Sequence, residues 1–251
     1  MSYLVHTSNG QLGALWLSFV CWTITASTLG IQWRVWHVAD TSVITSGAAS
    51  VGVWRTCFHS RVLVSPDYLI MFCQAMAATE DFVPPEIQAA QVLVPLALAA
   101  GLGGNAAGVY ALRNVYFGLA QSGRVTVRHA FSCAGALCAL SSALSLAPLA
   151  WNLHSVLANR TIAFPPRFHM PAAPVSQSAG AGLVVGMAAS VLMMVSGIVF
   201  LSYRLPPGVT SVVPPPAPRI ELRPLGPLNA AGGREGAMGK HNLAFECHER
   251  L

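Results

Sequence analysis

The stretch that decides the fold is ASVGVWRTCFHSRVLVSPDYLIMFCQ, residues 49–74. It contains Cys57 and Cys73, with Trp54 three residues before the first cysteine. The runs on both sides of Ser65-Pro66-Asp67 are rich in β-branched and aromatic residues, and this tripeptide is typical of a turn. The stretch therefore predicts an antiparallel hairpin within a chain that is otherwise largely apolar.

The chain as a whole is too apolar for a soluble domain. Of its 251 residues, 54% are hydrophobic and only 9% are charged, whereas soluble domains carry about a quarter charged residues. The net charge of +5 does not indicate nucleic-acid binding, because the basic residues are scattered and form no long run. Arginines on the cytoplasmic side of membrane spans explain the same charge.

Four stretches lack Asp, Glu, Lys and Arg over the length of about 20 residues that a helix needs to cross a bilayer. They are residues 11–31, 87–112, 130–151 and 178–203. A cleaved signal peptide is the alternative for the first stretch, but no basic residue precedes Arg34. Because an ion-coupled transporter usually keeps an ionisable residue within its spans, transport through the bundle is disfavoured.

The loops between these spans differ in charge. The loop after the second span contains Arg113, Arg124 and Arg128 and no acid, whereas residues 32–86 contain three arginines and five acids. Because cytoplasmic loops carry an excess of arginine and lysine, we expect both termini in the cytoplasm and residues 32–86 and 152–177 outside the cell. The sequence thus predicts a multi-pass plasma-membrane protein.

Small residues in two of the spans predict close helix packing. Gly104 and Gly108 form a GxxxG motif in the second span, and Gly182 and Gly186 form another in the fourth. Such motifs let helix backbones approach closely in lipid. We expect both motifs to pack inside one bundle rather than to form a dimerisation face.

Cys57 and Cys73 are the only cysteines in the predicted outer loops, where the oxidising environment preserves disulfides. The turn signal lies midway between them, so a hairpin would place them roughly opposite each other. We expect them to be bonded to each other; two free, buried cysteines are the alternative.

Residues around this hairpin resemble the claudin family. Trp33 in QWR, then Gly52-Val53-Trp54, then the cysteine pair follow the family's order of Trp, Gly-Leu-Trp and two cysteines. Three further stretches resemble the ends of its spans: PEIQAAQVL at 85–93, PLAWNLHSVL at 148–157 and GAGLVVGMAAS at 180–190. The resemblance covers about residues 10–207, with Val53 in place of the usual leucine.

The resemblance implies a membrane α-helical fold with a small β component. Residues 1–207 would form a four-helix transmembrane bundle capped by an extracellular antiparallel sheet, with most strands from the first outer loop and one from the second. Trp33 and Trp54 would anchor this sheet at the membrane surface, where indole rings prefer to lie. The composition of residues 208–251, which include Pro214-Pro215-Pro216, predicts a disordered, Pro-rich cytoplasmic tail.

The function that the resemblance implies is structural, at cell-cell tight junctions. The protein would associate with itself or with other claudins, side by side in one membrane and head to head between two, and so seal or tune the paracellular space. Exposed strand edges of the sheet would be available for pairing. The alternative is a four-span auxiliary subunit or adhesion regulator of another membrane protein. The lack of cysteines after the second and fourth spans, where palmitoylated claudins carry them, favours that alternative.

Three residues depart from the family pattern or set its charge. Cation-selective claudins place acids in or just after the hairpin, and rings of carboxylates attract cations. Here the hairpin carries Arg61, and its only acid, Asp67, lies at the turn. We expect a barrier rather than a cation channel; the alternative is that Arg61 is merely a solvated residue of the hairpin.

Gln91 stands where many members carry arginine. Because glutamine is neutral and offers fewer donors, this replacement would weaken an anchor between the sheet and the bundle.

Three further motifs are candidates for modification or binding. Asn159-Arg160-Thr161 is a glycosylation sequon, but it lies so close to a predicted span that its use is left open. Phe164-Pro165-Pro166 lies where claudins place a partner-contacting loop tip; a plain turn is the alternative. At the C-terminus, Glu249 and Leu251 form a candidate PDZ-binding end.

The sequence predicts no enzyme, cofactor or metal site and no nucleic-acid partner. No set of Ser, His and Asp or of Cys and His stands out as catalytic. Gly103-Gly104 lacks the strand and helix of a phosphate loop. His241, Cys247 and His248 lie in the predicted tail and supply too few ligands for a tetrahedral site.

Overall fold

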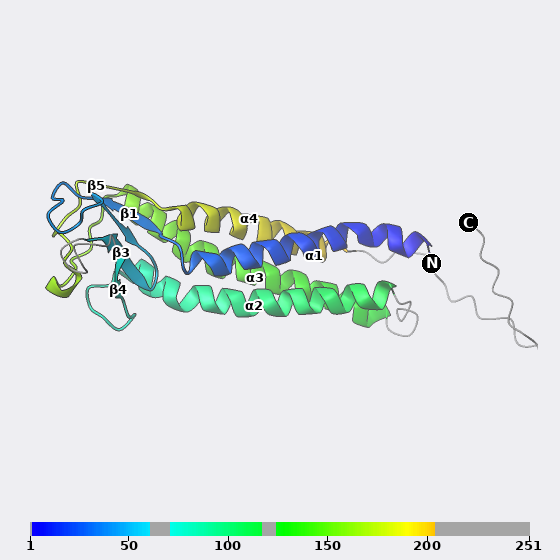
Figure 1. Ribbon diagram of the computed structural model, residues 1–251. Helices are drawn as coiled ribbons and strands as arrows, with labels where there is room; N and C mark the ends of the chain where they lie inside the picture. Colours follow the sequence, from blue (N-terminus) through cyan, green and yellow to red (C-terminus); the bar gives the residue numbers. More distant parts are fainter. Residues whose placement is uncertain (1, 61–70, 117–123, 204–251) are drawn as a thin grey trace, which may run out of the picture. The chain divides into compact units, whose positions relative to one another are not determined.

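The computed structural model describes residues 2–60, 71–116 and 124–203, which lie within one compact unit, residues 1–205. In this unit, long helices lie side by side and a small sheet stands at one end of the bundle (Figure 1). The helices are α1 (Ser2–Thr28), α2 (Pro85–Tyr116), α3 (Arg124–Leu157) and α4 (Ala181–Leu201). The strands are β1 (Arg34–His37), β2 (Ala48–Val51), β3 (Arg55–His59), β4 (Met71–Ala75) and β5 (Ser176–Ala179), and a 3-10 turn, η2, covers Pro166–Phe168. This is the predicted fold class. The predicted tail, residues 208–251, lies outside the described residues.

Each helix overlaps one predicted span but differs from it at the ends. α2 and α3 extend beyond residues 87–112 and 130–151 at both ends. The predicted spans were limited to stretches without charged residues. A helix can extend beyond such a stretch into water, because its backbone hydrogen bonds continue there. The fourth span was predicted to begin too early, because residues 178–179 belong to β5 and α4 begins only after its N-cap, Gly180.

Three of the described helices are long and apolar enough to cross a membrane: Pro85–Tyr116, Val127–Leu157 and Ala181–Leu201. α1 is also long, with 27 residues. It packs against α2 and α4, so it is a full member of the four-helix bundle.

The glycines of both GxxxG motifs face other parts of the same bundle, as predicted. A Cβ on Gly104 would lie 2.9 Å from the Cys138 sulfur on α3. One on Gly186 would lie 3.2 Å from the Leu149 side chain, also on α3. α2 and α4 therefore approach α3 so closely that a larger side chain would force the helices apart.

Hydroxyl groups connect the helices where glycine brings them together. Ser18 on α1 donates to Asn105 on α2 at 2.6 Å. On α3, Ser141 donates to the Ala97 carbonyl at 2.7 Å and Ser142 to the Ser190 carbonyl at 2.6 Å. Such bonds are favourable in lipid because no water competes for the same groups.

The sheet is antiparallel with the strand order β4-β3-β2-β1-β5. Its first four strands come from residues 32–86, and β5 comes from the end of the second loop, as the resemblance implies. Gly52-Val53-Trp54 forms the turn between β2 and β3. Residues 61–70 of the predicted hairpin lie outside the described residues.

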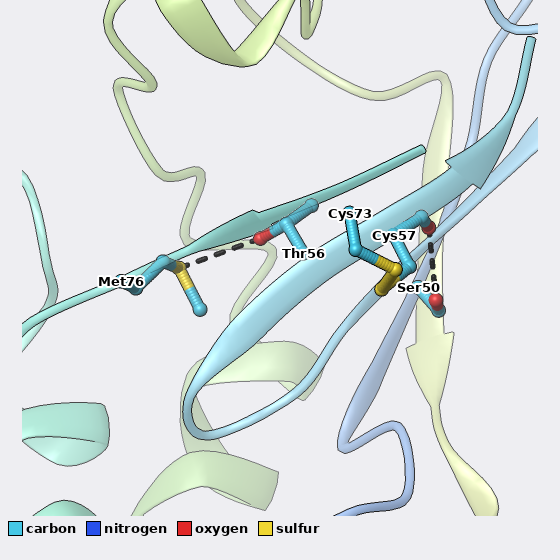
Figure 2. Close-up of a disulfide and its surroundings, with 5 residues drawn as sticks. All are labelled: Ser50, Thr56, Cys57, Cys73 and Met76. Atoms are coloured by element: carbon cyan, nitrogen blue, oxygen red, sulfur yellow. Dashed lines mark hydrogen bonds between the residues drawn. A yellow bond between two sulfur atoms is a disulfide. The ribbon is translucent and has the colours of Figure 1, made fainter. Parts of the chain in front are cut away.

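Cys57 and Cys73 form a disulfide, which confirms the prediction. They are paired directly across β3 and β4, with a Cα–Cα distance of 4.2 Å. Figure 2 shows the bond beside Ser50, whose hydroxyl donates to the Cys57 carbonyl at 2.9 Å and so connects the hairpin to β2. The cross-link fixes the register of β4, which pairs with a single strand, β3, among the described residues.

We predict that Cys57→Ala, Cys73→Ala and the double variant destabilise the outer sheet equally, by about 2–5 kcal/mol. The sheet has a small core, so loss of the cross-link is not compensated by other contacts. Thermal unfolding of detergent-purified protein and limited proteolysis from the outer side measure the effect. Cys133→Ala is the matched control because Cys133 is a free, exposed cysteine. An equal effect of Cys133→Ala would contradict the prediction.

Candidate functional site at the outer sheet

Trp33 connects the sheet to the bundle from inside the protein. Its side chain is fully buried, and its indole nitrogen donates to the Thr28 carbonyl at 3.0 Å. The surrounding cluster comprises Val53, Ala90, Val94, Leu149 and Leu183. The expectation that Trp33 lies at the membrane surface is therefore wrong: the ring fills the outer end of the core formed by α2, α3 and α4, and no part of it can reach lipid.

Two glycines, Gly180 and Gly182, let the start of α4 pack closely against residues 32–33, which follow α1. A Cβ on Gly180 would lie 2.4 Å from the Gln32 carbonyl oxygen, and one on Gly182 would lie 3.1 Å from the Trp33 ring. The backbone N–H groups of both glycines donate to the carbonyls of Trp33 and Gln32, at 2.8 and 2.9 Å. No side chain fits between these two segments.

The turn Gly52-Val53-Trp54 points one side chain inward and one outward. Val53 is fully buried in the cluster around Trp33, whereas Trp54 is 41% exposed. Gln91, on the first turns of α2, holds this turn: its amide nitrogen donates to the carbonyls of Val53 at 2.7 Å and Met76 at 3.1 Å. One side chain thus anchors the segments on both sides of the hairpin.

Gln91 anchors the sheet to the bundle at the position where many claudins carry an arginine. Its side chain is buried, and no donor among the described residues reaches its amide oxygen. A buried acceptor without a partner costs about 1–3 kcal/mol. The anchor therefore exists, and its weakness relative to an arginine stays a prediction.

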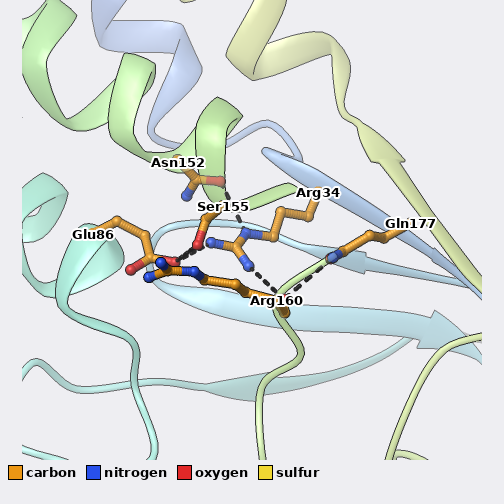
Figure 3. A network of polar contacts seen from close by, with 6 residues as sticks. All are labelled: Arg34, Glu86, Asn152, Ser155, Arg160 and Gln177. Atoms are coloured by element: carbon orange, nitrogen blue, oxygen red, sulfur yellow. Dashed lines mark hydrogen bonds and ion pairs between the residues drawn. The ribbon is translucent and has the colours of Figure 1, made fainter. Parts of the chain in front are cut away.

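A buried ion pair lies where β1 crosses the outer ends of α2 and α3 (Figure 3). Nη2 of Arg34 lies 2.5 Å from Oε1 of Glu86, and the same carboxylate oxygen accepts from the Ser155 hydroxyl at 2.6 Å. Nε of Arg34 donates to Asn152 at 2.9 Å, and its Nη1 to the Arg160 carbonyl at 3.5 Å. The pair connects β1, the start of α2 and the end of α3.

The ion pair is almost completely shielded from water. The side chains of Arg34 and Glu86 are 1% and 3% exposed. Burial lowers the pKa of the Arg34 guanidinium, while the hydrogen bond and charge of Glu86 act in the opposite direction. Removing one partner of such a pair costs much more than breaking a surface pair, because the other charge stays buried without compensation.

Sequence reasoning counted Arg34 and Glu86 only as loop charges and missed Asn152 and Ser155. The sequence contains two signals of this pair. Arg34 stands between Trp33 and Val35 in an apolar run, where an arginine needs a partner. Glu86 follows two prolines at the start of a helix, where an acid is favoured by the helix dipole. Only the fold shows that these two signals belong together.

The second outer loop folds back onto the first through aromatic rings. Phe164 packs against Trp36 at a centroid distance of 5.2 Å and against Phe168 at 5.3 Å. Phe168 also contacts Phe82 at a centroid distance of 5.1 Å. The Arg167 guanidinium lies over the rings of Phe82 and Phe168. Arg167 also pairs with Glu80. Phe164 is therefore half-buried within the chain, and a partner-contacting role for this loop stays a prediction.

The sheet ends in two strands that each have only one described neighbour. β4 pairs with β3 and β5 pairs with β1. Neither β4 (MFCQA) nor β5 (SQSA) contains a charged residue. An edge of this kind offers unpaired backbone groups to another strand, so the arrangement supports association with a second chain.

Several predicted site residues are not placed by the structure. Arg61 and Asp67, and the C-terminal Glu249 and Leu251, lie outside the described residues. Asn159 is described and exposed, in a turn that follows α3. Within residues 2–60, 71–116 and 124–203, no group of three or more His, Cys, Asp or Glu side chains could hold a metal ion.

Comparison with known proteins gives a consistent set of relatives. The model of the PMP-22/EMP/MP20/Claudin tight junction family matches residues 16–202. The chain is 28% identical over 171 residues to Claudin-2 of Canis lupus familiaris, covering 67% of this chain and 66% of that protein. It is 28% identical over 180 residues to Claudin-2 of Bos taurus, covering 70% and 69%. It is 29% identical over 199 residues to Claudin-3 of Canis lupus familiaris, covering 77% and 78%. The chain thus spans about two thirds of the length of the Claudin-2 relatives.

We predict that Gln91→Ala lowers the stability of the outer sheet by about 1–3 kcal/mol, because it removes both donors to the turn and hairpin carbonyls. Gln91→Arg should raise the melting temperature and the surface lifetime, since a guanidinium offers more donors and no orphan acceptor. Gln88→Arg is the control for an added charge on the same helix. If Gln91→Arg leaves both quantities unchanged, the weakened-anchor hypothesis is wrong.

A second prediction concerns the two ion pairs. Glu86→Gln should destabilise the protein by about 3–5 kcal/mol, because Arg34 then stays buried without a counter-charge. Glu80→Gln should cost about 0–1 kcal/mol, since its partner, Arg167, is 52% exposed. Thermal unfolding in detergent compares the two. Equal shifts would show that the buried pair does not hold the sheet on the bundle.

Proposed function

Because the chain belongs to the PMP-22/EMP/MP20/Claudin tight junction family, we propose that it is a structural tight junction protein of the cell membrane. It associates with itself or with other claudins, side by side within one membrane and head to head between two. This association seals or tunes the paracellular space, and the protein acts as a barrier rather than a cation channel. No catalytic step is part of this function.

The observation that carries the proposal is the sheet with two open edge strands on a rigid base. β4 and β5 each have one strand neighbour among the described residues. The disulfide fixes β4 in register, and the ion pair of Arg34 with Glu86 fixes the sheet on the helices. A preformed edge supports assembly because its residues lose little conformational entropy on binding.

The charge of the described outer surface supports a barrier. The exposed Arg167 of this surface is neutralised by Glu80. The strands β3 and β4 contain no acid, and β3 begins with the exposed Arg55. A lining that selects cations needs carboxylates, and this surface does not offer them on the hairpin strands.

Exposed aromatic rings suggest where the bilayer lies. Trp54 and Trp151 are 41% and 45% exposed at the end of the bundle that carries the sheet. Tyr110 on α2 is 52% exposed and lies 19 residues after Gln91, or about 28 Å along the helix at 1.5 Å per residue. This matches a hydrocarbon core of about 30 Å, so these rings would form belts at the two lipid surfaces. The lipid bilayer is then a direct partner of Trp54.

The orientation follows from the arginines. With the loop after α2 and both termini in the cytoplasm, the sheet faces the extracellular space. The C-terminal Glu249 and Leu251 would then be available to a cytoplasmic PDZ scaffold.

The test is expression of the full chain in cells that lack other claudins, followed by freeze-fracture imaging and by dilution potentials across an epithelial monolayer. We predict continuous strands, a raised resistance and no increase in sodium over chloride permeability. The double variant Cys57→Ala/Cys73→Ala, matched for surface amount, serves as the control for an intact sheet.

Two results would contradict this proposal in different ways. Diffuse particles instead of strands would favour an auxiliary subunit or adhesion regulator of another membrane protein. Strands with a clear rise in sodium permeability would support the junction role and refute the barrier.

A further inference from the structure

The sequon Asn159-Arg160-Thr161 forms an exposed turn directly after α3. Asn159 has φ 52°, in the left-handed region that asparagine adopts more readily than most residues. The backbone N–H groups of Asn159 and Arg160 donate to the carbonyls of Val156 and Ser155, both at 3.0 Å, and close the helix. The side chains of Asn159 and Thr161 are exposed, and among the described residues no hydrogen bond holds the Asn159 amide.

The sequon follows the stretch of α3 that packs beneath the sheet. Trp151, half exposed, is eight residues before Asn159, or about 12 Å along a helix. Between them, Asn152 and Ser155 bond to Arg34 and Glu86 in the buried network beneath the sheet. This part of α3 packs against the sheet and its supports, and the turn that follows it is exposed.

We propose that Asn159 carries an N-linked oligosaccharide, an inference that rests on the extracellular orientation in the proposed function. The donor is an oligosaccharide bound to a lipid diphosphate. The Asn159 amide nitrogen attacks C1 of its first sugar and forms a C–N bond, while the C1–O bond breaks and its electron pair leaves with the lipid diphosphate. The amide loses one proton to a base of the transferring enzyme. Thr161 supplies the hydroxyl that the sequon requires.

Such a glycan would lie beside one edge of the sheet. Gln177 of β5 donates to the Arg160 carbonyl at 3.2 Å, so the residue next to Asn159 is held against this edge strand (Figure 3). A large, hydrated glycan there covers the open edge of β5. Strand pairing with a neighbouring chain is then directed to β4 at the opposite end of the sheet.

The first test is the electrophoretic mobility of the full chain from mammalian cells, with and without peptide N-glycosidase. Wild type and Thr161→Ser, which keeps the sequon, should each lose one glycan-sized step in apparent mass, and peptide mapping should recover Asn159 as aspartate. Asn159→Asp and Thr161→Ala should migrate at the digested position without treatment. Asp tolerates the same backbone conformation, so this variant is expected to fold. A wild-type chain that the enzyme does not shift would overturn the proposal.

A new sequon separates failure of the site from failure of the orientation. Asp40→Asn in the Asn159→Asp background creates Asn-Thr-Ser in the exposed segment between β1 and β2. If only this variant is glycosylated, the proposed orientation stands and glycosylation of Asn159 is wrong. If neither chain is glycosylated, both the site and the orientation are wrong.

The second test measures the shielding of β5. Ser178→Cys places a thiol on the exposed edge strand, and a bulky membrane-impermeant maleimide should label it several-fold more slowly with Thr161→Ser than with Thr161→Ala. Thr79→Cys, exposed between β4 and α2, should be labelled at the same rate in both backgrounds. Equal rates at Ser178→Cys would overturn the shielding of β5.

Discussion

Arg34 and Glu86 meet where β1 passes the outer ends of α2 and α3, and almost no water reaches either side chain. A charge in such a place is tolerated only when its partner and its remaining hydrogen-bond groups are in position. Here Asn152, Ser155 and the Arg160 carbonyl complete the set. The ion pair therefore does more than add stability. It specifies one placement of the sheet on the bundle, because any shift would leave a buried charge unpaired.

Apolar packing provides the space in which this pair is buried. The Trp33 ring fills the end of the helical core, directly beside Arg34 in the sequence. Gly180 and Gly182 let the start of α4 contact the backbone around it. Gln91 then holds the turn before β3 and the segment after β4. A bundle in lipid and a sheet in water thereby become one unit, although their environments favour different residues.

This rigid attachment explains how a small sheet can serve as an interaction surface. A small sheet is independently stable in water only when it has a hydrophobic face or packs against a helix, and the five strands here are each only four or five residues long. The disulfide, the ion pair and the aromatic contacts between Trp36, Phe164 and Phe168 keep its edges in place. The same contacts hold the second loop against the first.

The sequence by itself determined the four helices, the strand-rich outer loop and the cysteine pair, because hydropathy, composition and spacing act locally along the chain. It also indicated the packing role of Gly104 and Gly186, since small residues in apolar helices have few other uses. It misplaced Trp33 at the lipid surface, because exposure of a ring depends on segments far away in the chain. The pairing of Arg34 with Glu86, and the bonds of Gln91 to the Val53 and Met76 carbonyls, were decided only by the tertiary structure, which brings together groups that are 15 to 52 residues apart.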